Sequence, residues 1–516
     1  MKNTLGIVLA AGKGERMKSE LAKVLHPIAG RPMASYPLDM MASLGLQKIV
    51  VIVGNQADAV TNAIQERLSK HKFEYTEQEK QLGTGHAVLQ AQRFLKKWKG
   101  NVIVISADVP LLTKDSLRSL LRQHVKAKAA VTVLSMTPDD PADYGRIIRD
   151  EDDEFKAIVE FRNAKPKQRE IDEVNTGIYI FEARFLFNGI KKLEADFKKA
   201  KGKKAKAKEF YLTDMVALAV ERKLPVQALC LPDASEGLGV NTRADLAHVQ
   251  MLMRNQINKG HMEKGVSIRD PYSTFIDADV RIGPDTVIEP IVHLRGNTRI
   301  GKGCKIMLGS YIENSTVGND VRIRPHSVIE KSSIGHNCRV GPNAHLRPKS
   351  DLAQDVSIGN YVEIKKSKIG QGSKINHLSY IGDALIGQNV NIGAGSITCN
   401  YDGLGKHQTI IDDNAFVGSD SQFVAPIKIG KSAYIGSGST ITRDVPAKSL
   451  SLTRARQETK EGWVDRWSKL REVRMAKVKE SQDKKEQPEP DNKSKRKPEP
   501  KKSTKAKPEA KSRKKK

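Results

Sequence analysis

The first 235 residues alternate between short apolar runs and longer stretches with helical periodicity. The apolar runs are rich in β-branched residues and lie at 5–9, 49–54 and 102–105. The helical stretches between them include 57–70 and 114–126. Continuous apolar runs are typical of strands that are covered on both faces. We therefore predict an α/β domain at 1–235, with a mostly parallel, Rossmann-like sheet.

A different pattern begins near residue 263. Ile or Val is repeatedly followed directly by Gly, and many of these pairs are spaced by multiples of about six residues. Among them are the pairs that begin at Ile282, Ile300, Val317, Ile334, Ile358, Ile369, Ile381, Ile386, Ile392, Val417, Ile429 and Ile435. Such a hexapeptide repeat predicts a parallel β-helix, in which the aliphatic side chain points inward and glycine helps to make the corner. We assign this domain to 263–450.

The remaining segments are predicted from their helical pattern and composition. Residues 236–262 are expected to be a helical linker, because 242–262 have an amphipathic pattern. Residues 451–480 are predicted as a charged helical extension. Residues 481–516 contain Lys, Pro, Glu and Ser with almost no apolar residues, which predicts a disordered tail.

The formal net charge of +28 at first suggests a nucleic-acid partner, but most of it is local. Residues 481–516 carry fifteen Lys or Arg and six Asp or Glu, and residues 191–208 carry nine Lys and two acids. The rest of the chain is mildly basic, which suits anionic small molecules without requiring a nucleic acid or a membrane. We expect 191–208 to be a solvated loop, although it could gather anionic substrate. We expect the tail to be solubilising and dispensable for activity, although it could contact nucleic acid, membrane or cell-wall partners.

No stretch approaches the roughly 18 apolar residues that a membrane-spanning helix needs. The N-terminus has no secretory pattern. The four cysteines are far apart and form no C-x-x-C pair: Cys230, Cys304, Cys338 and Cys399. This predicts reduced thiols in a cytoplasmic protein and argues against a zinc site.

The apolar run at 5–9 ends in a glycine-rich, basic loop at 12–17, before a helical pattern resumes. Glycine lets backbone N–H groups approach a phosphate, and Arg16 and Lys23 would add positive charge. The dinucleotide fingerprint fails because Met17 stands at its third glycine position. The only Gly-Lys-Ser, at 430–432, fails as a Walker loop because Ala425 stands at the first glycine position. Spacing alone leaves a nucleotide-binding loop and a tight turn both open.

Three segments of this region carry a longer motif: Leu9-Ala10-Ala11-Gly12-x-Gly14-x-Arg16-Met17, Lys23-Val24-Leu25-His26 and Ile28-Ala29-Gly30-x-Pro32-Met33. This motif resembles the signature of sugar-phosphate nucleotidyltransferases. Over about residues 1–465 the chain is most similar to the bacterial GlmU family, which combines N-acetylglucosamine-1-phosphate uridylyltransferase and glucosamine-1-phosphate acetyltransferase. Two departures are visible: Glu15 stands where the family usually has Thr, and Ala22 where it usually has Pro. The resemblance implies a left-handed β-helix, a homotrimer, Mg²⁺ as cofactor, and UTP and acetyl-CoA as co-substrates.

In the α/β domain the resemblance implies a uridylyl-transfer site. Asp108 follows the run at 102–105, at the edge where open α/β sheets bind ligands, although such an Asp is more often a helix cap. The resemblance makes Asp108 and Asn241 the Mg²⁺ ligands, and Ser106-Ala107 replaces its usual Tyr-Gly. Residues that would bind UTP and the sugar phosphate are Leu9, Ala10, Ala11, Gly12, Lys23, Gln78, Gly83, Thr84, Gly145, Glu160, Asn175 and Asn241. Of these, Gln78, Gly83 and Thr84 would face the uracil, whereas Gly145, Glu160 and Asn175 would hold the sugar. Without the resemblance, 83–85 would read as a turn and Glu160 as a surface carboxylate.

In the β-helix, acetyl transfer to an amine needs a base, and histidine has a suitable pKa. Residue chemistry does not choose among the candidates, which are His293, His326, His336, His345, His377 and His407. The resemblance assigns the general base to His377, with Glu363 expected from its position to orient or charge-stabilise it. The sugar phosphate would be held by Arg347, Lys365, Tyr380 and Asn391. The acetyl-CoA channel and the reacting groups would be lined by Ala394, Asn400, Tyr401, Ser419, Ser437 and Arg454, with Ser437 where the family often has Ala.

Two other functions remain open. A single-activity sugar-1-phosphate nucleotidyltransferase with a regulatory or oligomerising β-helix would not need the combination of His377, Asn400-Tyr401 and Arg454. A non-catalytic assembly subunit would be free to lose Lys23, Asp108 and His377. All of these residues are present, so the sequence favours the bifunctional enzyme that makes UDP-N-acetylglucosamine.

Overall fold

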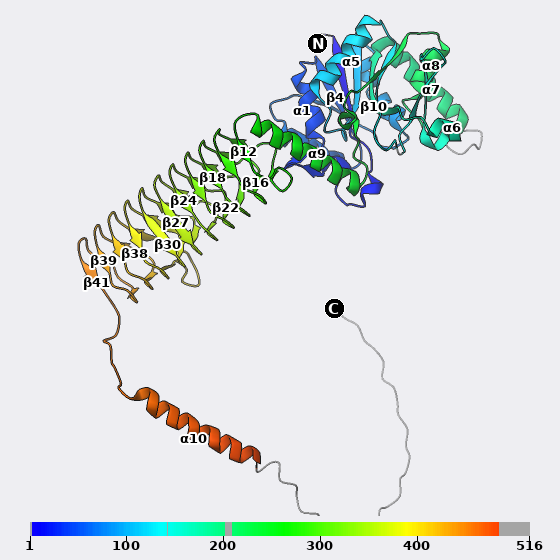
Figure 1. Cartoon of the computed structure of the whole chain (residues 1–516). Coiled ribbons are helices and arrows are strands. Elements are labelled where there is room, and N and C mark those ends of the chain that lie inside the picture. Colours follow the sequence, from blue (N-terminus) through cyan, green and yellow to red (C-terminus); the bar gives the residue numbers. More distant parts are fainter. Residues whose placement is uncertain (1–2, 142, 202–208, 484–516) are drawn as a thin grey trace, which may run out of the picture. The chain divides into compact units, whose positions relative to one another are not determined.

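The computed structural model describes residues 3–141, 143–201 and 209–483 (Figure 1). The chain divides into two units, Met1–Arg454 and Ala455–Lys516. The described part of the second unit contains helix α10 (Trp463–Asp483). The tail that the sequence predicts to be disordered lies outside the described residues, apart from the end of α10.

The N-terminal domain is built on one twisted sheet with helices on both sides (Figure 1). Its strand order is β11 (Val226–Cys230), β7 (Val131–Met136), β10 (Val174–Glu182), β6 (Asn101–Ser106), β1 (Thr4–Leu9), β4 (Lys48–Val53) and β5 (Glu74–Glu77). These pairs are parallel except where β10 runs antiparallel to β6 and β7. Strands β8 (Arg146–Arg149) and β9 (Phe155–Val159) extend the sheet from β10. The predicted mostly parallel α/β sheet is confirmed.

Eight α-helices accompany this sheet among the described residues. They are α1 (Ser35–Ser43), α2 (Ala57–Arg67), α3 (Thr84–Leu89), α4 (Gln92–Leu95), α5 (Lys114–Lys126), α6 (Pro166–Arg169), α7 (Ala183–Lys201) and α8 (Asp214–Glu221). The sheet has a hydrophobic core on each face. In β6, Val102 and Val104 belong to one core, whereas Ile103 and Ile105 belong to the other. This double burial explains why the strand sequences are continuously apolar.

Two local predictions are wrong. No α-helix follows the glycine-rich loop: the chain makes short 3₁₀ turns at Glu15–Met17 and Lys23–Leu25, because Gly14 and Lys18 adopt left-handed backbone angles that interrupt a helix. The lysine-rich segment is also not a loop from its start, since α7 continues to Lys201. Apolar residues in the first half of α7, including Ile190, pack into the core, and this packing favours a helix that continues into the lysine-rich segment. Residues 202–208 lie outside the described part.

The second domain consists of three parallel sheets that the chain visits in turn, as a β-helix does (Figure 1). The first sheet runs from β12 (Ser267–Ile268) to β41 (Leu450–Ser451), the second from β13 (Phe275–Ile276) to β40 (Thr440–Ile441), and the third from β14 (Arg281–Ile282) to β38 (Ile427–Ile429). Ile288 pairs with Ile306, eighteen residues later, so one coil contains three hexapeptides. The predicted β-helix of hexapeptide repeats is confirmed, while its left-handedness stays a prediction.

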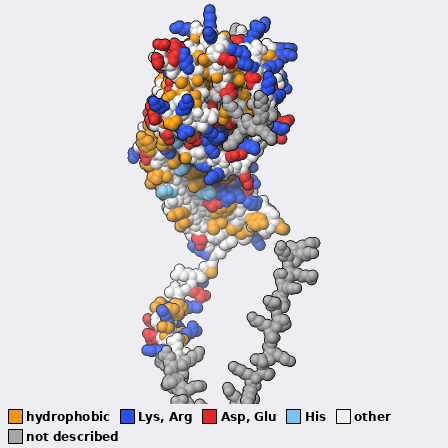
Figure 2. Space-filling view, turned by 90° about the vertical axis from the view of Figure 1, so that its right-hand side faces the viewer, with side chains coloured by type: hydrophobic (Ala, Val, Ile, Leu, Met, Phe, Trp, Pro, Cys, Tyr) orange, Lys and Arg blue, Asp and Glu red, His pale blue; other side chains and the backbone are white. Residues whose placement is uncertain are grey.

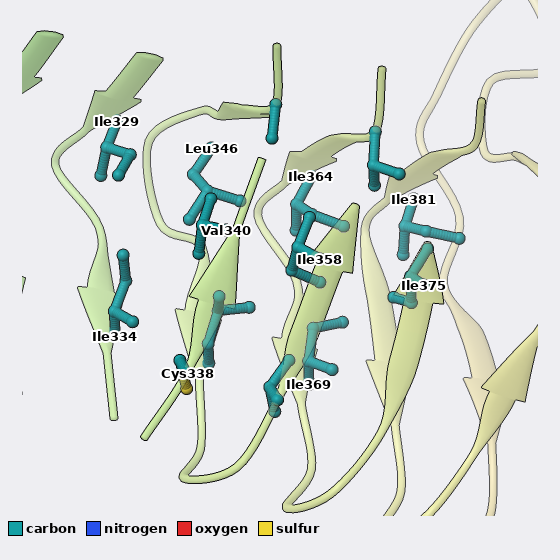
Figure 3. Close-up of a cluster of buried hydrophobic side chains, with 14 of the residues drawn as sticks. Ile329, Ile334, Cys338, Val340, Leu346, Ile358, Ile364, Ile369, Ile375 and Ile381 are labelled. Carbon is teal, nitrogen blue, oxygen red and sulfur yellow. The ribbon is translucent and has the colours of Figure 1, made fainter. Parts of the chain in front are cut away.

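The aliphatic residues of the repeat stack inside the β-helix (Figure 3). Ile329, Leu346, Ile364 and Ile381 occupy equivalent positions in successive coils of the second sheet. In the repeat, the glycine that directly follows many inward Ile and Val residues is explained by the close approach of the next coil. A Cβ on Gly359 would lie 1.9 Å from the carbonyl oxygen of Asn376, so a larger residue would push the coils apart.

The two domains are connected by α9 (Arg243–Met262), which packs against the first coils. The hairpin of β2 (Pro27–Ile28) and β3 (Arg31–Pro32) adds direct contacts. Asp279 of the β-helix pairs with both Arg31 and Arg67, and the Ala278 N–H donates to the carbonyl of Ala29 at 3.0 Å. Within the described residues, no helix is long and apolar enough to cross a membrane.

Candidate active sites

A cavity of about 440 Å³ opens at the carboxyl ends of β1 and β6 in the N-terminal domain. Its lining includes every residue that the family resemblance assigns to uridylyl transfer: Leu9, Ala10, Ala11, Gly12, Lys23, Gln78, Gly83, Thr84, Asp108, Gly145, Glu160, Asn175 and Asn241. Arg16, which we expected to face a phosphate, is not among the lining residues. The cavity therefore brings together residues that are separated by up to 232 positions in the sequence.

A positive charge is held at the floor of this cavity. The Lys23 ammonium pairs with the carboxylate of Asp108 and also donates to the Asn241 amide oxygen at 3.2 Å. Burial by itself would raise the pKa of Asp108, but the Lys23 ammonium outweighs burial and leaves that pKa below its ordinary value. Asp108 is therefore ionised at neutral pH, and its Oδ2 converges with the amide oxygen of Asn241 on the Lys23 ammonium.

On one side of the cavity, Gln78 fixes a glycine turn. Its amide nitrogen donates to the Gly83 carbonyl at 3.1 Å and lies 3.0 Å from Nδ1 of His86. Gly83 has φ of +122°, and a Cβ there would lie 2.4 Å from the carbonyl oxygen of Phe210. Thr84 caps the opposite segment, since its hydroxyl accepts from the Leu212 N–H at 2.9 Å. These contacts give this side of the cavity a fixed edge of backbone and amide groups. Such an edge suits recognition of a planar base.

The other side of the cavity carries hydroxyl, amide and carboxyl groups. Glu160 accepts from the Thr213 hydroxyl at 3.1 Å, and burial raises its pKa. The Asn175 amide donates to the Tyr179 hydroxyl at 2.7 Å. Burial and the neighbouring Glu209 raise the pKa of Tyr211 to about 12. This mixture of neutral and acidic hydrogen-bonding groups suits a sugar.

The sequence did not identify Glu209, Tyr211 and Thr213 as part of this lining. They follow the lysine-rich segment, and neither their spacing nor their composition resembles a binding motif. The one available signal was their place, directly before an apolar helical stretch that becomes α8.

The residues predicted for acetyl transfer lie on two adjoining sheets of the β-helix. His377 ends β30 (Lys374–His377) in the first sheet, and Asn391 begins β33 (Asn391–Ile392) in the next coil of that sheet. Lys365 ends β28 (Glu363–Lys365) and Tyr380 begins β31 (Tyr380–Gly382), which pair in the second sheet. His377 and Tyr380 flank the corner between these sheets, whereas Asn391 lies at the start of its strand and Lys365 at the end of its strand.

The predicted role of Glu363, to orient or charge-stabilise His377, stays a prediction, and the structure gives its carboxylate another partner. Glu363 lies in the second sheet, opposite Tyr380, and accepts a hydrogen bond from Nη1 of Arg347 at 2.8 Å. In the described part of the chain no hydrogen bond or ion pair links Glu363 to His377. The Arg347 guanidinium lies on an adjacent strand of the same sheet and attracts the Glu363 carboxylate, which accounts for this pairing.

A loop after β34 (Ile397–Cys399) adds a further cation to this group. Tyr401 and Lys406 form a β-bridge, and the Asp402 carboxylate closes the loop on Nε2 of His407 at 2.7 Å. The Lys406 ammonium lies beside Lys365 and lowers the pKa of Lys365. The sequence did not single out Lys406, because this loop interrupts the hexapeptide repeat and its return path has no periodic signal.

Three of the residues predicted to line the acetyl-CoA channel, Ala394, Ser419 and Ser437, form a row that follows the first sheet from coil to coil. A Cβ on Gly393 would lie 2.5 Å from the Ser419 nitrogen, and one on Gly418 would lie 2.5 Å from the Ser437 nitrogen, so successive coils touch here. Ala394 is adjacent to Gly393, and the Arg454 guanidinium donates to the Ser437 carbonyl at 3.3 Å. The row is therefore continuous with the His377 region.

Comparisons with known proteins agree with this division. A family model described as nucleotidyl transferase matches residues 5–227, one described as the GMPPB C-terminal domain matches 272–357, and one for the hexapeptide repeat of succinyl-transferase matches 408–443. The bifunctional protein GlmU of Pelobacter propionicus is 46% identical over 469 residues, which cover 91% of this chain and all of that protein. Those of Geobacter metallireducens and Listeria monocytogenes serotype 4a are 48% and 45% identical, covering 90% of this chain and 98% of each relative.

The chain belongs to the bifunctional GlmU family. Within this GlmU chain, the departures from the family pattern lie at different depths. Ala22 and Ala107 are buried, Ser106 lines the cavity, and Glu15 is exposed. None of them removes Lys23 or Asp108 from the cavity floor.

Proposed function

We propose that the chain divides the two GlmU activities between its two domains and makes UDP-N-acetylglucosamine. The β-helix transfers an acetyl group from acetyl-CoA to glucosamine-1-phosphate. The N-terminal cavity then transfers a uridylyl group from UTP to the N-acetylglucosamine-1-phosphate and releases pyrophosphate. The observation that carries this proposal is the convergence of thirteen predicted residues on one cavity of the N-terminal domain, whereas His377 and Asn391 lie in the β-helix.

In uridylyl transfer, a phosphate oxygen of N-acetylglucosamine-1-phosphate attacks the α-phosphorus of UTP in line with the leaving group. The new O–P bond forms as the bond to pyrophosphate breaks, so the protein has to position the reactants and offset negative charge. Lys23 supplies positive charge at the cavity floor. Gln78, Gly83 and Thr84 bind the uracil side, and Gly145, Glu160 and Asn175 hold the sugar.

Asp108 and Asn241 form a donor set that fits Mg²⁺. One carboxylate and one amide oxygen already converge on the Lys23 ammonium, which stands in for a cation, and Mg²⁺ prefers such oxygen ligands with substrate phosphates completing its shell. When bound, the ion would neutralise charge on the phosphates. Asp108 and Asn241 would hold it, and Lys23 would turn towards the phosphates.

In acetyl transfer, the glucosamine amine attacks the thioester carbon of acetyl-CoA. The C–N bond forms, the C–S bond breaks, and coenzyme A leaves as the thiol. His377 takes the proton from the amine as general base. Arg347, Lys365 and Lys406 bind the sugar phosphate, because three cations beside one another are suited to a dianion.

The remaining polar groups of this site position the reactants. Tyr380 and Asn391 hold the sugar, while Asn400 and Tyr401 orient the amine and the reacting carbonyl. Ala394, Ser419, Ser437 and Arg454 form the channel for acetyl-CoA.

The same proposal includes a homotrimer and a cytoplasmic location. Apolar side chains gather on the surface of the β-helix (Figure 2). In the C-terminal coils, the side chains of Phe416, Val424 and Tyr434 are 41%, 41% and 55% exposed. Such exposure on a rigid β-helix face suits contact with further copies of the chain. The four cysteines are all free thiols, which suits a reducing compartment.

A one-pot product assay tests the proposed function. Purified protein receives glucosamine-1-phosphate, acetyl-CoA, UTP and Mg²⁺, and mass spectrometry follows every sugar species. We expect UDP-N-acetylglucosamine together with free coenzyme A and pyrophosphate. A UDP-sugar without acetylation would favour a single-activity nucleotidyltransferase, and no product would favour a non-catalytic subunit.

A further inference from the structure

Asp383 is a buried carboxylate beside the acetyl-transfer cluster, and none of the steps above uses it. It is 6% exposed and directly follows β31. Its Oδ2 accepts a hydrogen bond from Nδ2 of Asn400 at 2.7 Å, and its Oδ1 pairs with Nζ of Lys366 at 3.0 Å. Its backbone N–H donates to the Lys365 carbonyl at 3.0 Å, and its carbonyl accepts from the Thr409 N–H at 3.2 Å. Each carboxylate oxygen of Asp383 therefore has a partner, and its backbone is held by two further hydrogen bonds.

Burial alone would raise the pKa of Asp383. The Lys366 ammonium and the Asn400 amide outweigh burial, so the pKa lies below its ordinary value and the group is ionised at neutral pH. An ionised carboxylate can only accept hydrogen bonds, whereas an amide has one donating and one accepting end. Asn400 must therefore turn its NH₂ group towards Asp383.

This constraint determines what Asn400 presents to the site. Its amide oxygen points away from Asp383 and has no hydrogen-bond partner among the described residues. Asn400 also lies beside Tyr380: a Cβ on Gly382 would be 2.4 Å from the Tyr380 hydroxyl and 2.8 Å from the Asn400 nitrogen. Asn400, whose acceptor is oriented and unpaired, thus lies next to Tyr380, one of the residues proposed to hold the sugar.

We propose that Asp383 is a positioning residue for acetyl transfer, which locks the Asn400 amide so that its oxygen accepts a hydrogen bond from the attacking amine. An acceptor on one N–H orients the amine, so that its lone pair can face the thioester carbon. With the amide reversed, two N–H groups would face each other and the amine would be turned away. This inference rests on the acetyltransferase activity proposed above.

The first test replaces Asp383 by Asn in the full chain. The new amide no longer dictates how Asn400 turns, so we expect kcat of acetyl transfer to fall by about 10- to 100-fold, the range for loss of a charge-assisted hydrogen bond. The KM for glucosamine-1-phosphate should change by less than about threefold, because the phosphate-binding cations remain. Uridylyl transfer, measured on the same preparation, should be unchanged. Asp351→Asn, on an exposed rung of the β-helix, is the matched control and should leave both activities intact.

Reversing the polarity of the pair separates orientation from packing. Asn400→Asp alone places two carboxylates against each other and should be the most damaging change. In the double variant Asp383→Asn with Asn400→Asp, the new amide can donate to the new carboxylate, whose second oxygen still accepts towards the site. We expect this double variant to recover at least about tenfold in kcat over Asn400→Asp alone.

The outcomes are distinct. If wild-type protein acetylates but Asp383→Asn keeps its kcat, or if the double variant is no better than Asn400→Asp, the inference about Asp383 is wrong. If Lys366→Gln costs as much as Asp383→Asn, Asp383 acts through its pairing with Lys366, and the inference is equally overturned. If wild-type protein releases no coenzyme A with glucosamine-1-phosphate, the proposed acetyltransferase function itself fails.

Discussion

At the scale of single residues, Asp108 and His124 show how burial acts on groups with and without a charged partner. Burial opposes the charged form of both groups. Asp108 remains ionised because Lys23 lies against it. His124 packs under α5 with the Thr132 hydroxyl 2.9 Å from its Nδ1, and burial lowers its pKa to about 4. The partnered group can serve chemistry in the cavity, whereas the unpartnered one is a neutral part of the core.

His124 should make the N-terminal domain sensitive to mild acid. The pKa is about 6.5 in the unfolded chain and about 4 in the folded one, so the unfolded state binds the proton first as the pH falls. Its contribution to the free energy of unfolding is full above pH 6.5 and falls by up to about 3 kcal/mol as the pH drops towards 4. Urea unfolding at several pH values should show a weaker pH dependence for His124→Gln than for wild type. Parallel curves for the two proteins would contradict this assignment.

At the scale of elements, the β-helix coil is stabilised by stacking of identical positions. Each inward aliphatic residue contacts its equivalents in the coils before and after it, so a single truncation affects three coils (Figure 3). The corner glycines permit this spacing, as Gly359 illustrates. Shortening one inward side chain therefore leaves a cavity in the core, because the neighbouring coils cannot move in to fill it.

Truncating one inward residue should therefore be costly. Ile364 is fully buried between Leu346 and Ile381, and Ile364→Ala should lower the free energy of unfolding by about 2–5 kcal/mol through lost burial and the cavity left behind. Leu404→Ala, at a side chain that is 98% exposed, should change it by less than about 0.5 kcal/mol. Thermal and denaturant unfolding of the two variants checks this. Equal effects would mean that the stacked core does not limit stability.

The same scale explains what the sequence could predict. The coils were predictable because inward Ile or Val and corner Gly recur with the period of the structure, and the β1, β4 and β6 strands because both of their faces are buried. The motif that contains Lys23, together with Asp108 after the run at 102–105, identified the cavity through the resemblance to a family. The Asp383–Asn400 contact and the return of Lys406 towards Lys365 were not predictable, since they depend on register between coils and on a loop that interrupts the repeat. The helical part of the lysine-rich segment was not predicted, because its many lysines suggested a solvated loop, whereas apolar residues of α7 pack on the core.

At the scale of the whole molecule, the two sites belong to different domains that are fixed to each other. Asp279, in the first coils of the β-helix, forms ion pairs with both Arg31 and Arg67. Arg31 lies in the hairpin that follows the Lys23 turn. This hairpin therefore connects the floor of the N-terminal cavity to the β-helix. No residue of the His377 cluster lines that cavity, so each site has its own chemistry within one chain.

The central claim is that the chain holds two separable catalytic sites, and paired substitutions test it most directly. Asp108→Asn and His377→Gln are each assayed for uridylyl transfer and acetyl transfer, with thermal unfolding as the check of folding. The account predicts that Asp108→Asn loses at least about 100-fold in uridylyl transfer alone and that His377→Gln loses about as much in acetyl transfer alone. A substitution that removed both activities from folded protein, or neither, would contradict it.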